Sequence, residues 1–323
     1  MELKTTISLI LFAIFARNTY ERLKQRRTKK VPVTSERVLI LGASTGVGRV
    51  LATLYAKRGA RVCVVGRREG IIREVVQECL HTSSPSSSES TKKILGIAGD
   101  FADAEAMIGL RDTLKTEWQG VDTVIVAAGV SALQPLLTVA GLENNQGTLE
   151  PGQISQEGLQ HTIDVAMAAT RGNYLGPLVS AVTFIPLLTE TSKSPAILLV
   201  SSVAAVIPPP TRTLYGSTKA ASLVLYQALS VEHPDIAFTH FLPATIEGDF
   251  RASAVDNGPV READPNKHGL RREVVAGRCI EAIDRGEKMV FMPKYMRYGH
   301  LLYWIWPAFV EWRARVKYNF LRK

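Results

Sequence analysis

Cysteine is scarce in this chain of 323 residues, which contains only Cys63, Cys79 and Cys279. Their number is odd and they are far apart, so the sequence offers neither a disulfide framework nor the paired spacing of a metal site. The Asn-x-Ser/Thr pattern of N-glycosylation is absent as well. These absences favour free, buried thiols in a reducing compartment, and no metal is expected.

The N-terminus lacks a hydrophobic run long enough to cross a membrane comfortably. Residues 5–16 are mostly apolar, whereas a spanning helix needs about 20 such residues. We therefore expect residues 1–35 to form a membrane-anchor-like segment, lying in one leaflet or thinning the bilayer, and a basic linker. The basic residues follow the run, opposite to the order in a cleaved signal peptide, and this order places the body on the cytosolic side.

Acidic residues are rare at both ends of the chain. Residues 1–35 contain 8 Lys and Arg against 2 Asp and Glu, residues 293–323 contain 7 against 1, and the body between them has a net charge of −3. No nucleic-acid surface is therefore expected on the body. Three of the four tryptophans lie in 293–323, next to basic residues, as is typical of a membrane interface. The alternative, an arm that packs on the body or on a second subunit, stays open.

Strand and helix patterns alternate between these two tails. Short apolar runs predict strands at 38–41, 61–65, 94–97, 123–126, 196–200, 236–241 and 289–292. Longer patterns predict helices at 47–58, 69–80, 102–117, 159–188, 214–231 and 273–285. The expected fold class is α/β, with a Rossmann-type, doubly wound parallel sheet and helices on both faces, over residues 36–292.

A glycine-rich turn follows the first predicted strand and opens the first predicted helix. Glycines in such a turn let the backbone approach a pyrophosphate, whose charge lies at the helix N-terminus. The pattern therefore predicts that a nucleotide is bound here. The residues expected to contact it are Gly42, Ser44, Thr45, Gly46, Val47 and Gly48.

Two residues after the next strands bear on the choice of cofactor. Arg67 ends the second strand, where an acidic residue would hold the ribose of NAD. An Arg there can pair with a 2′-phosphate, so NADP(H) is expected; the alternative is a solvated charge at a strand end. Asp100 follows the third strand, where its carboxylate either meets the adenine edge or forms an Asx turn or cap for the next helix.

Tyr215 and Lys219 are four residues apart in a predicted helix, so both side chains share one face. A positive charge beside the phenol favours its ionised form, which suits Tyr215 to proton transfer. The spacing alone proves little, because Tyr20 and Lys24 repeat it by chance. What distinguishes Tyr215 is Ser202, whose hydroxyl follows a buried strand and faces the crevice where α/β sheets bind ligands.

With these motifs in place, residues 37–292 resemble the short-chain dehydrogenase/reductase family. The glycine turn matches that of the family, and Asn173, Ser202, Tyr215 and Lys219 match its catalytic tetrad. The resemblance implies that Tyr215 is the general acid or base and that Ser202 holds the substrate's carbonyl oxygen. It also implies that Lys219 binds the nicotinamide ribose and that Asn173 places a water in the proton relay.

Some positions around the cofactor depart from the family pattern. Leu41 replaces the usual Thr before the first glycine, Ala127 replaces the Asn of an Asn-Ala-Gly motif, and Gly248 stands where a Thr is common. The rest of that motif, Ala128 and Gly129, is expected to contact the cofactor. These departures concern how the cofactor is framed and leave the proton-transfer groups unchanged.

Together these features predict a membrane-associated, NADP(H)-dependent oxidoreductase that moves a hydride between the nicotinamide and a ketone or secondary alcohol. The resemblance to membrane-bound members implies an apolar substrate of lipid, steroid, sphingoid or terpenoid type, with residues 131–160 and 244–272 walling the pocket. A homodimer and a location at the endoplasmic reticulum or a lipid droplet, facing the cytosol, are also expected. Two alternatives stay open: an inactive nucleotide-binding scaffold, and a soluble enzyme whose hydrophobic ends make subunit contacts.

Overall fold

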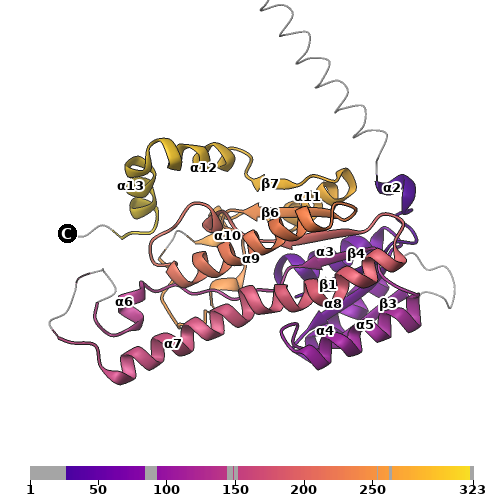
Figure 1. Cartoon of the computed structure of the whole chain (residues 1–323), viewed down its shortest axis with the longest axis horizontal. Helices are drawn as coiled ribbons and strands as arrows, with labels where there is room; N and C mark the ends of the chain where they lie inside the picture. The colour runs from indigo at the N-terminus through magenta and orange to yellow at the C-terminus, as the bar shows by residue number, and fades with distance from the viewer. Residues whose placement is uncertain are drawn as a thin grey trace, which may run out of the picture.

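The computed structural model describes residues 27–83, 93–143, 148, 152–252, 254–261 and 264–320. The expected anchor at 5–16 lies outside these residues. Within them, one parallel sheet of seven strands forms the centre of the protein, in the order β3-β2-β1-β4-β5-β6-β7 (Figure 1). The strands are β1 (Arg37–Leu41), β2 (Arg61–Gly66), β3 (Ile94–Ala98), β4 (Thr123–Val126), β5 (Ala196–Val200), β6 (Ala237–Pro243) and β7 (Met289–Met292).

The strand order reverses between β1 and β4. The chain steps outward from β1 to β3 and then returns to the other side of β1 for β4 to β7. Open α/β sheets bind ligands at the carboxyl ends of the strands beside such a reversal. The predicted doubly wound α/β fold is confirmed, and the sheet places a crevice where the glycine turn and Ser202 meet.

Helices cover both faces of the sheet. The first face carries α3 (Gly46–Lys57), α4 (Glu69–Thr82) and α11 (Arg272–Arg285), and the second carries α5 (Ala104–Trp118), α8 (Gly176–Thr191) and α9 (Thr213–Glu232). Along β1, Val38 and Ile40 face the first group and Leu39 and Leu41 face the second, as the alternation of side chains along a strand requires. Because both faces are covered, the strands are mostly apolar, with Arg37 and Arg61 at strand starts and Thr239 and His240 in β6 among the exceptions.

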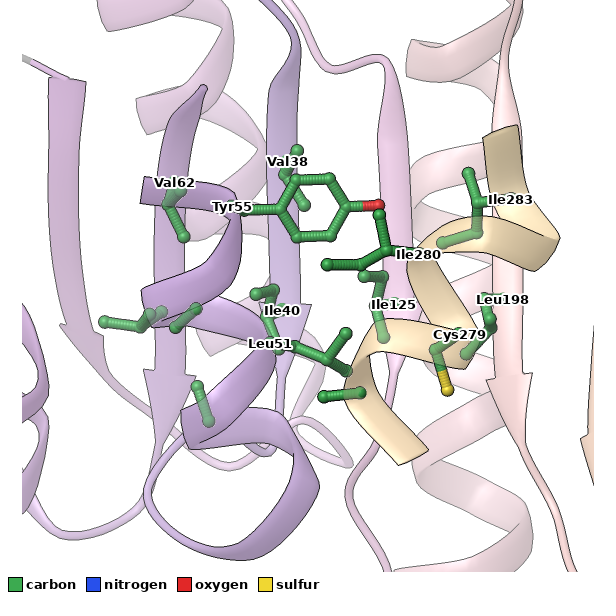
Figure 2. Close-up of a cluster of buried hydrophobic side chains, with 14 of the residues drawn as sticks. Val38, Ile40, Leu51, Tyr55, Val62, Ile125, Leu198, Cys279, Ile280 and Ile283 are labelled. Carbon is green, nitrogen blue, oxygen red and sulfur yellow. The ribbon is translucent and has the colours of Figure 1, made fainter. Parts of the chain in front are cut away.

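The core on the first face joins α3 to α11 across the sheet. Figure 2 shows the ring of Tyr55, from α3, reaching over Val38 toward Ile280 of α11. Tyr55 is completely buried, so its ring stabilises the fold by leaving water, although its buried hydroxyl, without a hydrogen-bond partner among the described residues, offsets part of that gain. This packing holds α3, whose first turn is the glycine turn, against the sheet.

All three cysteines lie in this apolar interior. Cys63, Cys79 and Cys279 are buried and free, which confirms the prediction of buried thiols. Burial raises the pKa of each thiol, to about 12 for Cys79. The thiols therefore stay protonated at neutral pH and are poor nucleophiles.

One long helix runs from Gln156 to Thr191 in three parts: α7 (Gln156–Thr170), a π-helical turn η2 (Arg171–Leu175) and α8. The sequence predicts a helix over 159–188 but not the π turn inside it. Among the described residues, this helix alone is long and apolar enough to cross a membrane, and half of its most apolar window is buried inside the protein. The α8 part packs on the sheet and belongs to the core of the domain, whereas most residues of α7 are exposed.

Two predicted pocket walls, 131–160 and 244–272, are joined at one buried carboxylate. Asp256 Oδ2 accepts hydrogen bonds from the backbone N–H groups of Leu133 (2.6 Å) and Gln134 (2.7 Å). The backbone N–H of Val255 donates to the carbonyl of Ser131 at 2.9 Å. The short elements of these segments are α6 (Leu136–Val139), η4 (Asp249–Arg251) and α10 (Pro265–His268).

The C-terminal tail forms two helices, α12 (Met296–Ile305) and α13 (Pro307–Lys317), which project at one end of the molecule (Figure 1). Their inner side packs on the body: His300 Nδ1 lies 3.1 Å from the carbonyl oxygen of Val206, and its ring stacks on Phe291. Their outer side is apolar and exposed, with Trp304 at 75 % and Ile305 at 81 % of their full accessibility. The tail thus has one face on the body and one face in solvent.

The basic N-terminal linker contacts the N-terminal ends of the strands through Arg27. This side chain is buried in α2 (Arg27–Lys30), and its guanidinium donates to Glu36 Oε1 (2.5 Å), Thr123 Oγ1 (2.6 Å) and the carbonyl of Ser194 (2.9 Å). The packed body therefore includes Arg27, nine residues before Glu36.

Candidate active site

The three glycines of the turn are required for different reasons. Gly42 has a φ of +91°, and a Cβ there would lie 2.4 Å from the backbone nitrogen of Ala128. Gly46 has a φ of +59°, a conformation that side-chain-bearing residues rarely adopt. Gly48 lies inside α3, where a Cβ would meet the carbonyl oxygen of Gly42 at 2.1 Å. The turn is therefore closed against itself and against β4, and its backbone is open toward the crevice.

A single cavity of about 1530 Å³ at the carboxyl ends of the strands brings the predicted site residues together. Asn173 is the one predicted residue that does not line it. The predicted residues that line it are Gly42, Ser44, Thr45, Gly46, Val47, Gly48, Arg67, Asp100, Ala128, Gly129, Ser202, Tyr215 and Lys219.

Ser202 leaves β5 and begins the short 3₁₀ helix η3 (Val203–Ala205). Its Oγ accepts a hydrogen bond from the backbone N–H of Ala204 at 3.1 Å. Because that bond uses a lone pair, the hydroxyl proton stays available to a ligand in the cavity. The strand end thus presents a hydrogen-bond donor at a fixed position.

Tyr215 and Lys219 lie one turn apart on α9, and both are largely buried. The ring of Tyr215 meets Phe250 of η4 edge-on, with centroids 6.1 Å apart. Lys219 Nζ donates to the carbonyl of Val200 at 3.1 Å. Burial lowers the pKa of Lys219 from 10.5 to about 8. The ammonium is thus held beneath the cavity and is close to losing its proton at moderately alkaline pH.

Asn173 sits in the π turn and is completely buried. Its Oδ1 accepts from the backbone N–H of Val130 (2.9 Å), and its Nδ2 donates to the Val130 carbonyl (3.0 Å) and to Thr218 Oγ1 (3.1 Å). A Cβ on Gly129 would lie 2.9 Å from Asn173 Oδ1 and 3.0 Å from Lys219 Nζ. Glycine at 129 therefore lets the amide and the ammonium converge behind the cavity wall.

Asp100 forms the Asx turn that was one of the local roles predicted for it. Its Oδ1 accepts from the backbone N–H of Ala102 at 3.0 Å in an Asx turn, and its Oδ2 pairs with Arg171 at 2.8 Å. The cap of α5 is Asp103, which accepts from Ala106 N–H at 2.8 Å. The helix begins two residues later than predicted, so of the two local roles predicted for Asp100 the Asx turn is observed and the cap is not. The place of Asp100 in the cavity wall also agrees with a cofactor contact.

The sequence reasoning missed Arg212, a buried cation beside the tyrosine. Its guanidinium carbon lies 5.6 Å from the ring centre of Tyr215 and 5.8 Å from that of Tyr318, and its Nη1 donates to Ser131 Oγ at 3.4 Å. Arg212 is only 4 % exposed. The sequence feature that could have identified Arg212 is its position three residues before Tyr215, which places both side chains on the same face where the helix begins. The contact with Tyr318 needs the tertiary fold.

The family model for short chain dehydrogenases matches residues 36–258 of this chain. Since the match covers more than half of the chain, the protein belongs to the short-chain dehydrogenase/reductase family of oxidoreductases, whose fold binds a nicotinamide cofactor. The membership that the tetrad and the glycine turn predict is thereby confirmed.

Individual relatives are distant. The protein named 11-beta-hydroxysteroid dehydrogenase A from Sesamum indicum is 26 % identical over 295 residues, covering 88 % of this chain and 76 % of the relative. A short chain dehydrogenase/reductase from Burkholderia phymatum, solved with NAD, superposes with a TM-score of 0.67 at 16 % identity, covering 83 % of this chain and 92 % of its own. One from Burkholderia cenocepacia J2315, solved with NADP, gives 0.63 at 18 % identity, covering 87 % and 98 %. The two structures share the fold of this chain.

Proposed function

We propose that this protein is an NADP(H)-dependent reductase or dehydrogenase that interconverts a ketone and a secondary alcohol on an apolar substrate. The observation that carries the proposal is that Ser202, Tyr215 and Lys219 line the same cavity as the glycine turn. These residues place a hydroxyl donor, a phenol and a buried ammonium beside the glycine turn. Such a site can transfer one proton to or from the substrate oxygen while a hydride is transferred to or from its carbon. The name of the Sesamum indicum relative, a hydroxysteroid dehydrogenase, agrees with an alcohol or ketone substrate.

The residues at one end of the cavity fit a dinucleotide. Gly42 and Gly48 leave no room for a side chain between turn and strand, and the turn opens the N-terminus of α3, where phosphate charge is favoured. Arg67 and Arg68 line the cavity at the end of β2 and form no ion pair within the described ranges. Their charges support a 2′-phosphate contact and so the choice of NADP(H). When bound there, the nicotinamide supplies or accepts the hydride.

The protein's own groups manage the proton and the carbonyl oxygen. We assign the transferred proton to the Tyr215 hydroxyl and a hydrogen bond to the substrate oxygen to Ser202 Oγ. Lys219, fixed by the Val200 carbonyl, keeps a positive charge beside these groups below pH of about 8. Asn173 and Thr218 hold the loop at Val130 and act as positioning residues.

The apolar outer face of α12 and α13 supports a membrane-associated enzyme. Trp304, Ile305 and Trp306 are more than half exposed and adjoin helix α13, which lines the cavity. Exposed aromatic side chains with basic neighbours suit the headgroup region of a bilayer. The proposal includes a cytosol-facing location at the endoplasmic reticulum or a lipid droplet, and a homodimer. Membrane fractionation of the full chain tests the location, and recovery in the soluble fraction would contradict it.

The reaction is tested by following NADPH absorbance with a panel of apolar ketones. We expect Tyr215→Phe to lower kcat by about 100- to 10,000-fold, the usual contribution of general acid catalysis. Binding of NADPH, followed by fluorescence, should be retained, because the ring and its packing against Phe250 remain. Equal rates in the two proteins would remove Tyr215 from the proton step, and no turnover of any ketone would favour the non-catalytic scaffold.

The cofactor choice is tested separately with Arg67→Asp. Loss of one charge-assisted hydrogen bond to phosphate costs about 1.5–3 kcal/mol, so KM for NADPH should rise roughly 10- to 100-fold, while KM for NADH stays equal or falls. Exposed Arg73, on α4 outside the cavity, provides the matched control as Arg73→Asp. An unchanged NADPH-to-NADH ratio would exclude Arg67 from the phosphate site.

A further inference from the structure

One buried hydroxyl in the cavity wall has no hydrogen-bond partner within the part of the chain that the structure describes. Ser201 lines the cavity between β5 and Ser202, is 3 % exposed, and its Oγ is unpaired. Ser180, which is also buried, is paired, because its Oγ donates to the carbonyl of Gly176 at 2.7 Å. A buried hydroxyl without a partner lowers the free energy of unfolding, since it has given up its hydrogen bonds to water. Ser201 is therefore a group that a bound molecule can satisfy.

The backbone fixes the place of Ser201 at the carboxyl end of β5. Its N–H donates to the carbonyl of Phe241 at 2.8 Å, which continues the ladder between β5 and β6. The next residue, Ser202, has an extended backbone (φ −159°, ψ 153°), and consecutive side chains of an extended chain point to opposite sides. The hydroxyls of Ser201 and Ser202 therefore do not converge on one ligand atom. If Ser202 holds the substrate oxygen, Ser201 serves another group.

Ser201 adjoins both parts of the site that the proposed function assigns to the cofactor. Strand β4 runs beside β5, and Ala128 and Ser201 lie at equivalent positions beyond the ends of the two strands. The backbone nitrogen of Ala128 borders the glycine turn, 2.4 Å from where a Cβ on Gly42 would lie. Lys219 Nζ donates to the carbonyl of Val200, the residue before Ser201, at 3.1 Å. Ser201 thus lies between the glycine turn and the proton-transfer groups.

The carboxamide of the nicotinamide is the polar group of the cofactor that remains for Ser201. In the proposed function the phosphates lie at the glycine turn and at Arg67, the ribose is expected at Lys219, and the substrate oxygen meets Tyr215 and Ser202. The carboxamide has a carbonyl acceptor and two N–H donors, so a hydroxyl can pair with it either by donating or by accepting. A neutral hydroxyl also suits a neutral amide, whereas the phosphates require cations or backbone N–H groups.

We propose that Ser201 Oγ binds the carboxamide of the nicotinamide and thereby restricts rotation of the ring about its bond to the ribose. This inference rests on the proposed function, because it assigns Ser201 to the cofactor of the same site. The hydroxyl is unpaired in the cofactor-free protein and paired in the complex. Its removal should therefore have opposite effects on the stability of the cofactor-free protein and on the affinity for the cofactor.

Binding of two ligands to the full chain, measured by calorimetry, tests the assignment. The first ligand is NADP⁺, and the second is 2′-phospho-ADP-ribose, which has both riboses and all the phosphates of NADP⁺ but lacks the nicotinamide. We expect Ser201→Ala to weaken NADP⁺ binding about 5- to 20-fold, the effect of losing a neutral hydrogen bond and leaving its partner unpaired. Its affinity for 2′-phospho-ADP-ribose should equal that of the wild type. Equal losses for the two ligands, or no loss for NADP⁺, would overturn the proposal.

Ser180→Ala is the matched control, because it removes a buried and paired hydroxyl of α8 that does not line the cavity. This variant should bind both ligands as the wild type does. The same comparison with NAD⁺ and ADP-ribose makes the test independent of whether NADP(H) is the preferred cofactor.

Denaturant unfolding gives a second readout, which for the cofactor-free protein involves no binding. Cofactor-free Ser201→Ala should unfold at an equal or higher denaturant concentration than the wild type, because the substitution removes an unpaired buried polar group. The same concentration of NADP⁺ should raise the midpoint of the variant less than that of the wild type. A lower midpoint for the cofactor-free variant would mean that the hydroxyl is already paired within the protein, and this would overturn the proposal.

The binding measurements separate this inference from the reaction. If no ketone is reduced but Ser201→Ala still loses affinity for NADP⁺ and not for 2′-phospho-ADP-ribose, the proposed reaction fails and the role of Ser201 stands. If ketones are reduced and the two ligands lose affinity equally or not at all, the reaction stands and Ser201 is excluded from the nicotinamide contact.

Discussion

The two ends of the cavity are built in contrasting ways, and we name them after the proposed function: the cofactor end lies at the glycine turn, and the substrate end lies beyond Tyr215. The cofactor end is made by one short stretch of chain, β1, the glycine turn and α3, closed against β4 by contacts of backbone with backbone. The substrate end is assembled from four distant segments, namely the loop before α9, residues 244–252, α12 and α13. A backbone cradle tolerates almost no change, whereas a wall of side chains on loops and terminal helices can vary without disturbing the sheet. The comparison suggests that cofactor binding and substrate choice can be altered independently.

Gly48→Ala should produce the largest effect and confine it to the cofactor end. The new methyl group would lie 2.1 Å from the carbonyl oxygen of Gly42, so the turn must shift by a distance comparable to an atomic radius. A misplacement of about 1 Å costs roughly 100-fold, and we expect at least that loss in NADPH affinity by fluorescence titration.

Gly109→Ala is the matched control for this substitution, because a Cβ at this exposed site in α5 meets nothing within 4 Å. The control should bind NADPH normally and be slightly more stable, since Ala favours a helix. Normal NADPH affinity in Gly48→Ala would show that the cradle is more adaptable than its geometry indicates.

Lys219→Met tests the point where the two ends meet. Burial lowers the lysine pKa from 10.5 to about 8, so the folded protein holds this proton less well than the unfolded chain. Below pH 8 the buried, protonated lysine lowers the free energy of unfolding by its full amount. This cost disappears as the pH rises toward 10.5. At pH 7 the free energy of unfolding of the variant should therefore exceed that of the wild type by up to about 3 kcal/mol, with no gain at pH 10.5. The variant should also lose activity.

Denaturant titrations of the cofactor-free protein at the two pH values measure this difference. Lower stability of Lys219→Met at pH 7 would mean that the hydrogen bond to the Val200 carbonyl outweighs the desolvation of the charge. In the wild type, ketone reduction should decline above pH of about 8 as the ammonium loses its proton.

The smallest expected effect concerns the outer surface of the substrate end. Trp304→Ser/Ile305→Ser removes two of the most exposed apolar side chains of α12 and should weaken binding to phospholipid vesicles about tenfold, measured by flotation. Val231, on α9, is 80 % exposed, so Val231→Ser is the control and should bind vesicles as the wild type does. Turnover of a water-soluble ketone should be unchanged in both. Equal vesicle binding by all three proteins would separate this surface from membranes.

The sequence could predict what local chain geometry determines. The alternation of apolar strands and helices predicted the sheet, and the positions of the glycines, Tyr215 and Lys219 predicted residues that line one cavity. It could not give contacts that depend on packing between distant segments, such as Arg212 against Tyr318 or Asp256 across two loops. For the same reason the C-terminal tail stayed ambiguous, because one of its faces packs on the body and the other is exposed.

Smaller errors have local causes. The start of α5 was misplaced because two acidic residues, Asp100 and Asp103, compete for the cap, and only the hydrogen bond to Ala106 decides between them. The π turn was missed because hydrophobic periodicity continues on both sides of it. A one-residue irregularity is invisible to a pattern read over several turns.

That π turn carries a consequence for how this protein can change. Residues 171–175 contain one residue more than an α-helical turn would hold, so α7 and α8 are rotated by roughly 100° relative to an uninterrupted helix. Deleting one residue there would restore a regular helix and turn α7 away from its present neighbours. It would also move Asn173 out of reach of Val130. The position of Asn173 and the orientation of the fifteen-residue helix α7 thus depend on the same extra residue, and its deletion would change both.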